Sequence, residues 1–436
     1  MSKKSKTLPR KKINSVLKEV LKKVEPAKED IKLIENSLKD FLERFGKKLK
    51  SLKIDAEIFV GGSFAKNTVI KKDNYDVDIF VRFDKKYDNK EISNLLSKAL
   101  KPFEKITKVH GSRDYFKLKI SPTFFIELIP VKKIKTLKEA ENITDLSYSH
   151  VRYINKKVKS KKVLDEIRIA KGFCYANNCY GAESYIQGFS GYALELLIYY
   201  YGSFTKFISA VAKMSDEKIV IDIEKHFRNK QIALMDINSA KLNSPIILVD
   251  PTYKHRNVLA ALSDETFEKF KLACKKFLKN PSIKSFEIEK IDLEKVKTDA
   301  KKKKYEFILI ETKTNKQEGD IAGSKLLKFY RHLGSEIEDF FYIKKKGFNY
   351  NGKKSARYFF VVKDKGEIVR AGPYLKDKKH VAKFKKKHKR TFQDKGRIHV
   401  KKKINFTLKD FIETWKTKNR KKVREMDIVG LKNVNY

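Results

Sequence analysis

Two aspartates, one residue apart, lie within a run of apolar residues in the first quarter of the chain. Asp76 and Asp78 belong to "DVDIFVRF" (76–83), a pattern typical of a β-strand. Residues two apart on a strand point to the same face, so the two carboxylates are expected to stand together. Unpaired neighbouring carboxylates repel, and a divalent cation that prefers oxygen ligands, such as Mg²⁺, relieves the repulsion. An isolated D-x-D is also common on the wet face of an edge strand, so the preceding segment decides between the two interpretations.

That preceding segment, "FVGGSFAKNT" (59–68), is typical of a strand, a Gly-Gly-Ser turn and the start of a helix. Glycines let backbone amides approach a phosphate, and the free N–H groups of a helix start attract anions. Ser63 can hydrogen-bond a phosphate oxygen, and Lys66, one helical turn later, can lie over it. The turn and the following D-x-D strand together predict a site that holds a triphosphate and its metal.

A third carboxylate, Glu127, lies in the apolar strand-like segment "FFIELIPV" (124–131). A charge in such a strand needs a partner or a metal, because leaving it buried and unpaired is costly. We therefore predict Asp76, Asp78 and Glu127 as the catalytic carboxylates and metal ligands of a two-metal site. Two rival motifs fail, since "GDIAGSK" (319–325) lacks the spacing of a Walker A loop and "GFSGY" (188–192) is not a nucleophile elbow.

The composition sets the class of protein around this site. A chain of 436 residues with 41% hydrophobic and 12% aromatic residues predicts a globular protein of about three domains. The 101 basic and 54 acidic residues give a net charge of +47, which favours a nucleic-acid partner, although a lysine-rich composition can also follow from biased genomic base composition. No apolar run approaches the roughly 18 residues of a membrane span, and the basic start lacks a signal-peptide pattern, so a cytoplasmic protein is expected. The three cysteines (Cys174, Cys179 and Cys274) are expected to be small buried hydrophobes rather than a disulfide framework or zinc site.

The pattern of hydrophobic residues divides the chain into three regions. Residues 1–145 combine helical periodicity, broken at Pro26, with short strands and predict a mixed-sheet catalytic head. Residues 146–262 are mainly helical and predict a neck, and residues 263–436 alternate strands and helices and predict an α/β body and tail. The fold class is therefore α+β and multi-domain. The main expected strands are 56–60, 76–83, 115–120, 124–131, 245–250, 305–312 and 356–364.

Longer sequence blocks narrow the class of protein further. The GS and D-x-D elements look like the nucleotidyltransferase superfamily that includes DNA polymerase β and poly(A) polymerases. "YGAESYIQGFSGY" (180–192), "DPTYKHRNV" (250–258) and "AGPYLKDKKHVAKF" (371–384), in this order, closely resemble the archaeal, class I CCA-adding enzymes. The resemblance implies a head, neck, body and tail, and Mg²⁺-dependent addition of C, C and A to the 3′ end of tRNA from CTP and ATP without a template. It also suggests a homodimer.

The same resemblance implies roles for individual residues. Ser63 and Lys66 fall where the family contacts the triphosphate, and Asp76, Asp78 and Glu127 fall on its metal ligands. His150, Lys171 and Tyr180 match nucleotide-contacting positions in the neck. Arg256 matches the arginine that reads the base edge together with the tRNA backbone. We assign phosphate-backbone contacts to five basic residues of the tail, with a merely solvated helix face as the alternative: Lys385, Lys386, Lys387, Lys389 and Arg390.

Three positions depart from the family's pattern. Lys66 stands where the family usually has arginine, Glu127 where it usually has aspartate, and Ser147-Tyr148 replaces a Thr-Pro pair before His150. These changes are expected to tune affinity and metal preference. Two alternatives stay open: another template-independent RNA nucleotidyltransferase that adds poly(A) or oligo(A), and a non-catalytic tRNA-binding protein with a decayed site.

Overall fold

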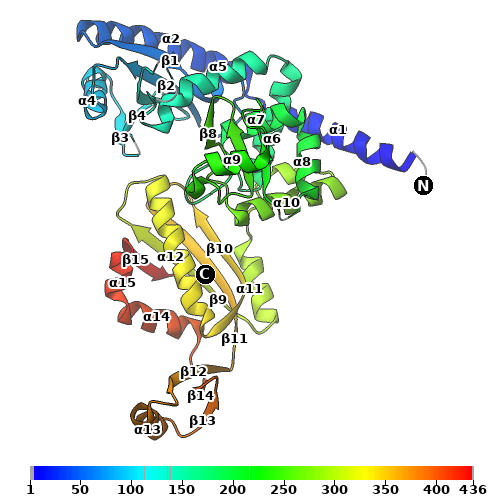
Figure 1. Ribbon diagram of the computed structural model, residues 1–436, viewed down its shortest axis with the longest axis vertical. Coiled ribbons are helices and arrows are strands. Elements are labelled where there is room, and N and C mark those ends of the chain that lie inside the picture. Colours follow the sequence, from blue (N-terminus) through cyan, green and yellow to red (C-terminus); the bar gives the residue numbers. More distant parts are fainter. Residues whose placement is uncertain (1–3, 112, 135, 137–138, 216, 435–436) are drawn as a thin grey trace. The chain divides into compact units, whose positions relative to one another are not determined.

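The chain forms two compact units, residues 1–289 and 290–436 (Figure 1). The computed structural model describes residues 4–434 except 112, 135, 137, 138 and 216. Both units mix helices with sheets, which confirms the predicted α+β, multi-domain class. No helix in the described part of the chain is long and apolar enough to cross a membrane.

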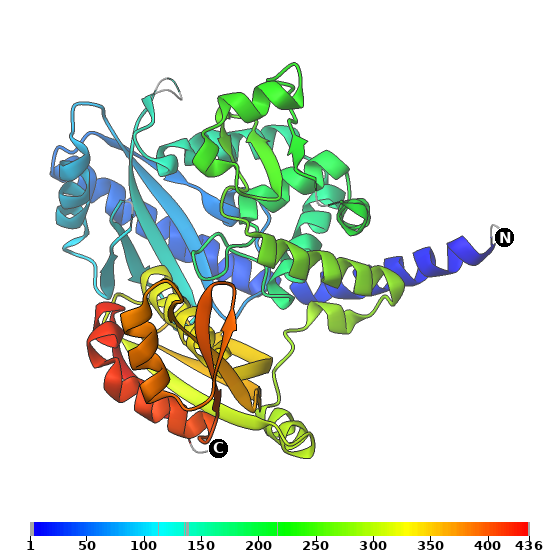
Figure 2. The same cartoon turned by 60° about the horizontal axis from the view of Figure 1, so that its bottom comes forward.

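The first unit begins with two long helices, α1 (Lys4–Val24) and α2 (Lys28–Ser51). Pro26 lies between them as predicted, because proline lacks the N–H that a continuous helix would need. The apolar residues of α2 recur every three or four positions and are buried against the neighbouring sheet (Figure 2). These residues are Ile34, Leu38, Phe41, Phe45 and Leu49.

The sheet beside α2 has five strands in the order β1-β2-β5-β4-β3. β2 pairs with β5 in parallel, and the other pairings are antiparallel. The predicted strands are confirmed to within one residue, whereas β3, with only four residues, was not predicted. The helix α4 (Asn89–Leu100) packs on the same core and begins at a capping box. The strands are β1 (Ala56–Val60), β2 (Tyr75–Phe83), β3 (Ile106–Val109), β4 (Tyr115–Lys119) and β5 (Phe124–Lys132).

The rest of the first unit is a helical region around an aromatic core, with a small sheet in the order β6-β7-β8. α10 (Asp264–Lys279) packs on this core through Phe270 and Phe277. Residues 263–289, expected in the body, therefore lie within the first unit, and the division of the structure falls after them. The remaining elements are α5 (Ser147–Lys157), α6 (Lys161–Ala176), α7 (Gly191–Tyr201), α8 (Phe204–Lys213), α9 (Lys230–Asp236), β6 (Ile219–Ile221), β7 (Ile246–Asp250) and β8 (Tyr253–Asn257).

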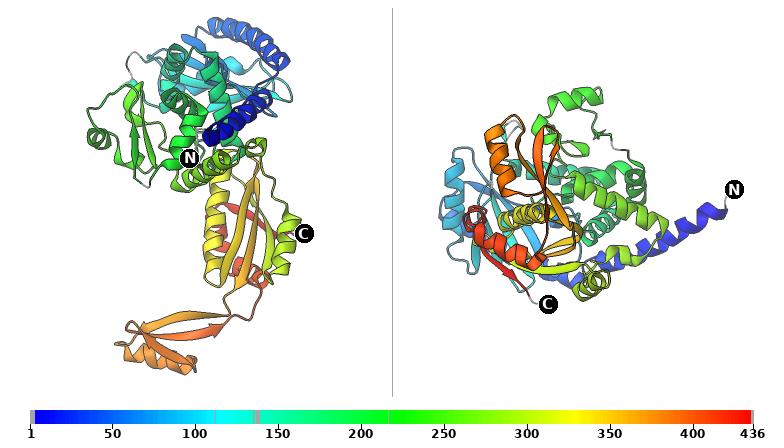
Figure 3. Two further views of the ribbon diagram at one scale, coloured as in Figure 1. Left: turned by 90° about the vertical axis from the view of Figure 1, so that its right-hand side faces the viewer. Right: turned by 90° about the horizontal axis from the view of Figure 1, so that it is seen from below.

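The second unit contains a four-stranded antiparallel sheet, β10-β11-β9-β15, and a three-stranded sheet, β12-β14-β13. α12 (Asp320–Glu338) and α14 (Leu408–Lys418) cover one face of the larger sheet, and α11 (Leu293–Lys302) covers the other (Figure 3). β10 was not predicted because its central residues are lysines and lie exposed on an edge strand. The strands are β9 (Glu306–Thr314), β10 (Phe341–Tyr350), β11 (Ser355–Asp364), β12 (Glu367–Tyr374), β13 (Thr391–Asp394), β14 (Arg397–Lys403) and β15 (Ile428–Asn433); α13 (Lys378–Lys387) and α15 (Arg420–Glu425) complete the unit.

Candidate active site

The Gly-Gly-Ser turn joins β1 to a single helical turn, α3 (Gly62–Ala65). The Gly61 N–H donates to the Asp78 carbonyl at 2.8 Å, which fastens the turn to β2. Gly62 has φ +63°, and a Cβ there would overlap the Asp78 carboxylate, so only glycine fits. The helix expected after the turn is one turn long, and it is too short to supply the anion-attracting dipole of a longer helix.

The three predicted carboxylates lie on the neighbouring parallel strands β2 and β5. Asp78 stands directly opposite Glu127 in the register, and Asp76 lies two residues before Asp78. Burial, together with the charges of Glu127 and Asp76, raises the pKa of Asp78 to about 7, although Lys66 and Lys72 oppose this shift. The structure therefore concentrates negative charge at one end of the β2–β5 pair.

Glu127 also has a cationic neighbour within the sheet. Lys117 on β4 donates to its carboxylate at 3.1 Å, while burial raises the pKa of Glu127 above its ordinary value. Among the described residues, no three His, Cys, Asp or Glu side chains are arranged as a set of metal ligands. The donor chemistry still fits a hard divalent cation, because carboxylates that raise one another's pKa are stabilised in the ionised form by added positive charge.

Lys66 and Lys171 share one buried counter-ion, Glu195 on α7. Lys66 donates to Glu195 at 2.6 Å and Lys171 at 2.8 Å, and the Thr68 hydroxyl donates to it at 2.7 Å. Burial alone would raise the pKa of Glu195, but the two ammonium groups lower it to about 2. This network joins the head turn to the neck helices. Glu195, the residue at its centre, was not predicted from the sequence. The available signal was a single acid within the apolar run "GYALELLIYYY" (191–201).

A second buried network surrounds Asp250 at the end of β7. Its carboxylate accepts from Arg256 at 2.6 Å and lies 3.0 Å from the His150 ring nitrogen. Tyr192 donates to the same carboxylate at 3.2 Å and stacks on His150 with ring centroids 4.2 Å apart. Burial lowers the pKa of His150 below its ordinary value, and Asp250 opposes that shift. Asp250 therefore positions two of the predicted nucleotide-contacting side chains, His150 and Arg256.

The pair Ser147-Tyr148 begins the helix α5, and His150 lies in the first turn of that helix. The Arg82 guanidinium lies 3.8 Å from the centre of the Tyr148 ring, and the Phe59 ring packs edge-on against it at 4.7 Å. Tyr148 thus ties α5 to the head sheet, an arrangement that proline could not provide.

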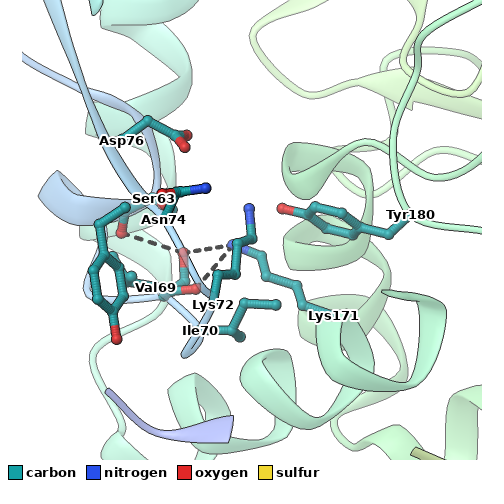
Figure 4. A pocket seen from close by; sticks show the side chains of 10 residues that line it. Ser63, Val69, Ile70, Lys72, Asn74, Asp76, Lys171 and Tyr180 are labelled. Carbon is teal, nitrogen blue, oxygen red and sulfur yellow. Dashed lines mark hydrogen bonds between the residues drawn. The ribbon is translucent and has the colours of Figure 1, made fainter. Parts of the chain in front are cut away.

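A pocket opens where the head turn faces the neck helices (Figure 4). Its lining brings together four predicted residues, namely Ser63, Asp76, Lys171 and Tyr180, and adds Lys72. Figure 4 shows the Tyr180 hydroxyl pointing toward the ends of the two lysine side chains. The other predicted residues of this region do not line it: Lys66, Asp78, Glu127, His150 and Arg256.

The predicted basic residues of the tail lie at the end of α13 and just after it. The five residues are exposed: Lys385, Lys386, Lys387, Lys389 and Arg390. α13 packs on the small sheet through Phe384, which contacts the backbone near Gly372. The lysine side chains are therefore free to face a polyanion.

The fold of the head is of the nucleotidyltransferase type. Residues 38–170 match a family model described as "Nucleotidyltransferase domain", and residues 165–287 match one described as "tRNA nucleotidyltransferase, second domain". Together the two models span more than half of the chain. The chain is therefore similar to tRNA nucleotidyltransferases across residues 38–287.

Relatives named CCA-adding enzyme match different lengths of the chain. The one from Nanoarchaeum equitans is 41% identical over 48% of this chain and 52% of its own length. The relative from Methanocaldococcus jannaschii is 28% identical over 87% of this chain and 85% of its own length. The relative from Saccharolobus shibatae is 33% identical over 64% of this chain and 63% of its own length. A solved structure of Cid1 poly(U) polymerase shares the fold, with a TM-score of 0.50 and 13% identity over 63% of this chain and 98% of that chain.

Proposed function

We propose that this protein is a CCA-adding tRNA nucleotidyltransferase, which adds C, C and A to the 3′ end of tRNA from CTP and ATP without a nucleic-acid template. The observation that carries the proposal is the pocket in which Ser63 and Asp76 of the head face Lys171 and Tyr180 of the neck. A pocket that is acidic on one side and cationic on the other suits a nucleoside triphosphate and its metal. The relatives' similarity across the head and neck supports the same activity.

In the proposed reaction the tRNA 3′-oxygen forms a bond to the α-phosphorus, the bond from that phosphorus to pyrophosphate breaks, and the hydroxyl proton is released. Asp76, Asp78 and Glu127 would hold Mg²⁺, which when bound lowers the pKa of the hydroxyl and stabilises the charge on pyrophosphate. Gly62 leaves room for the Asp78 carboxylate beside the turn. Lys171 offsets triphosphate charge as a compact cation.

Base selection in this proposal depends on Arg256. Its guanidinium offers a planar fork of donors to a base edge, and Asp250 holds one of its nitrogens at 2.6 Å. The buried Nε of Arg256 has no hydrogen-bond partner among the described residues, which leaves a donor for the nucleotide or the tRNA backbone. His150 and Tyr192, stacked on each other, close the side of this network.

The tRNA would be held largely by charge. The net charge of +47 favours a polyanion, and the exposed basic cluster of α13 is proposed to contact its phosphates. A homodimer and a cytoplasmic location stay predictions.

The test is incorporation by the full chain on a tRNA transcript that lacks its last three nucleotides, with Mg²⁺ and CTP, ATP or both. Two additions with CTP alone, and a third only with ATP present, are expected from the wild type. Asp78→Asn, which keeps the shape of the side chain, is expected to add nothing while binding the tRNA normally. Long A tails would support the poly(A) alternative, and tight tRNA binding without addition would support a decayed site.

A further inference from the structure

The two lysines predicted to contact the triphosphate are not equally available to it. Lys66 has a side chain only 8% exposed, donates to Glu195 at 2.6 Å, and does not line the pocket. Lys171 is also bound to Glu195, but it lines the pocket beside Tyr180. Lys66 therefore acts as a partner of a buried carboxylate, and the pocket needs its second phosphate-binding cation from elsewhere.

Lys72 is placed to supply that cation. It lies in the segment that leads into β2, is half-buried and lines the pocket with Ser63, Asp76 and Lys171. Its ammonium lies 5.5 Å from the centre of the Tyr180 ring (Figure 4). Within the described part of the chain its ammonium has no hydrogen bond and no ion pair. Its neighbour Lys71 is exposed and does not line the pocket, which makes it a matched control.

The charges around Lys72 favour an anionic ligand. The ring of Tyr180 gives a cation only modest stabilisation. Lys171 adds a second positive charge, and Glu195 is already shared between Lys171 and Lys66. Asp76 is the acidic residue of the lining, and Lys72 also acts electrostatically on Asp78 and Glu127. All three carboxylates are the proposed metal ligands, so a bound cation would offset their negative charge. A half-buried ammonium in this setting gains most from a ligand that brings several negative charges, as a chain of phosphates does.

We infer that Lys72, and not Lys66, is the second lysine that binds the triphosphate of the incoming nucleotide, while Lys66 serves to position Glu195 and Lys171. This inference rests on the proposed function, because that function brings the triphosphate to the pocket. A single ammonium suffices to hold a buried carboxylate, and this is the role that the contact with Glu195 leaves to Lys66.

The experiment compares Lys72→Met with Lys71→Met in the full chain. Lys72→Met is expected to raise the KM for CTP and for ATP about tenfold, with a smaller effect on kcat, because a charge-assisted contact to the substrate is lost. It should weaken the binding of inorganic tripolyphosphate, measured by titration calorimetry, by a similar factor, whereas a contact with the base would leave that binding unchanged. Lys72→Arg should restore both, and Lys71→Met should leave both at wild-type values.

Lys66→Met separates the two roles. It is expected to lower the melting temperature of the first unit, whereas Lys72→Met should leave that temperature unchanged. Wild-type KM and tripolyphosphate binding in Lys72→Met would overturn the inference while leaving the proposed function intact. If the wild type adds no nucleotide but Lys72→Met alone loses tripolyphosphate binding, the proposed function fails and the phosphate site at Lys72 stands.

Discussion

Replacement of Glu195 by glutamine is the most informative perturbation of the buried network between head and neck. The change keeps the shape of the side chain but removes the negative charge that Lys66 and Lys171 share. Both ammonium groups are then buried without a counter-ion, since their side chains are only 8% and 1% exposed. Breaking such a buried pair by removing one partner typically costs about 3–5 kcal/mol.

The ionisation of Lys171 sets the size of this effect. Burial lowers the pKa of Lys171 to about 8, with Glu195 opposing the shift. In Glu195→Gln that opposition is lost, so the pKa of Lys171 falls further and the lysine loses its proton near neutral pH. This lowers the unfolding free energy by roughly 1–2 kcal/mol relative to wild type. With the weakened hydrogen bonds added, the first unit should lose about 3 kcal/mol of unfolding free energy at neutral pH.

The sign of the pH dependence follows from linkage. In the variant the folded state binds fewer protons at Lys171 than the unfolded state does, so stability rises with pH until the unfolded lysine also titrates. The deficit of Glu195→Gln relative to wild type should therefore shrink between about pH 7 and 8, and it should stay constant at higher pH, where the folded wild type has lost the same proton from Lys171. A deficit that grows over that range would contradict the assignment of Lys171 as the group that releases its proton.

The assay uses the chain's single tryptophan as an internal reference. Trp415 lies in the core of the second unit, so its fluorescence reports that unit, while circular dichroism reports both. The melting transition of the first unit should fall by about 10 °C, and the Trp415 transition should stay in place. Glu43→Gln, which breaks an exposed pair with Lys47, is the control and should shift neither transition. A first-unit transition within 1–2 °C of wild type would refute a stabilising role for Glu195.

Three further predictions test other parts of the structure. Gly62→Ala, which forces a side chain against Asp78 at φ +63°, should lower nucleotide addition at least about 100-fold while tRNA binding persists; near-normal kinetics would show that the turn is not fixed. Burial lowers the pKa of His150, so stability should fall as pH drops below about 6.5, and His150→Gln should reduce that slope, as acid unfolding curves can measure. Replacing the five basic residues after Phe384 with alanine should reduce the salt dependence of tRNA binding by up to about 4 in the log–log slope, and an unchanged slope would exclude them as phosphate contacts.

Much of the fold follows from local patterns. The alternation in 76–83 and the three- and four-residue spacing of α2 predicted their elements because burial on one face selects such patterns. β10 was not predicted because its lysines are exposed on an edge strand. Burial therefore does not select an alternation of apolar and polar residues there. The boundary between the two units could not be predicted from local pattern either. The sequence of α10 indicates only an amphipathic helix, and its packing on α8 assigns it to the first unit.

Part of the candidate site could likewise be predicted from the sequence, and part could not. Its carboxylates on β2 and β5 were recognised because charges within apolar strands stand out in the sequence. The partners of its lysines could not be predicted, since Glu195 lies 129 residues from Lys66 and only the fold brings them together. The different roles of Lys66 and Lys72 likewise depend on which of them faces the pocket, and the spacing along the chain does not reveal this.

The measurement that tests the central proposal most directly is the sequence of the 3′ ends made by the purified full chain from a tRNA lacking CCA, with all four nucleoside triphosphates at equal concentration. We expect products that end in C-C-A and stop there, because the pocket selects the base and the finished end is no longer extended. Runs of A or U, or untouched ends on bound tRNA, would contradict it.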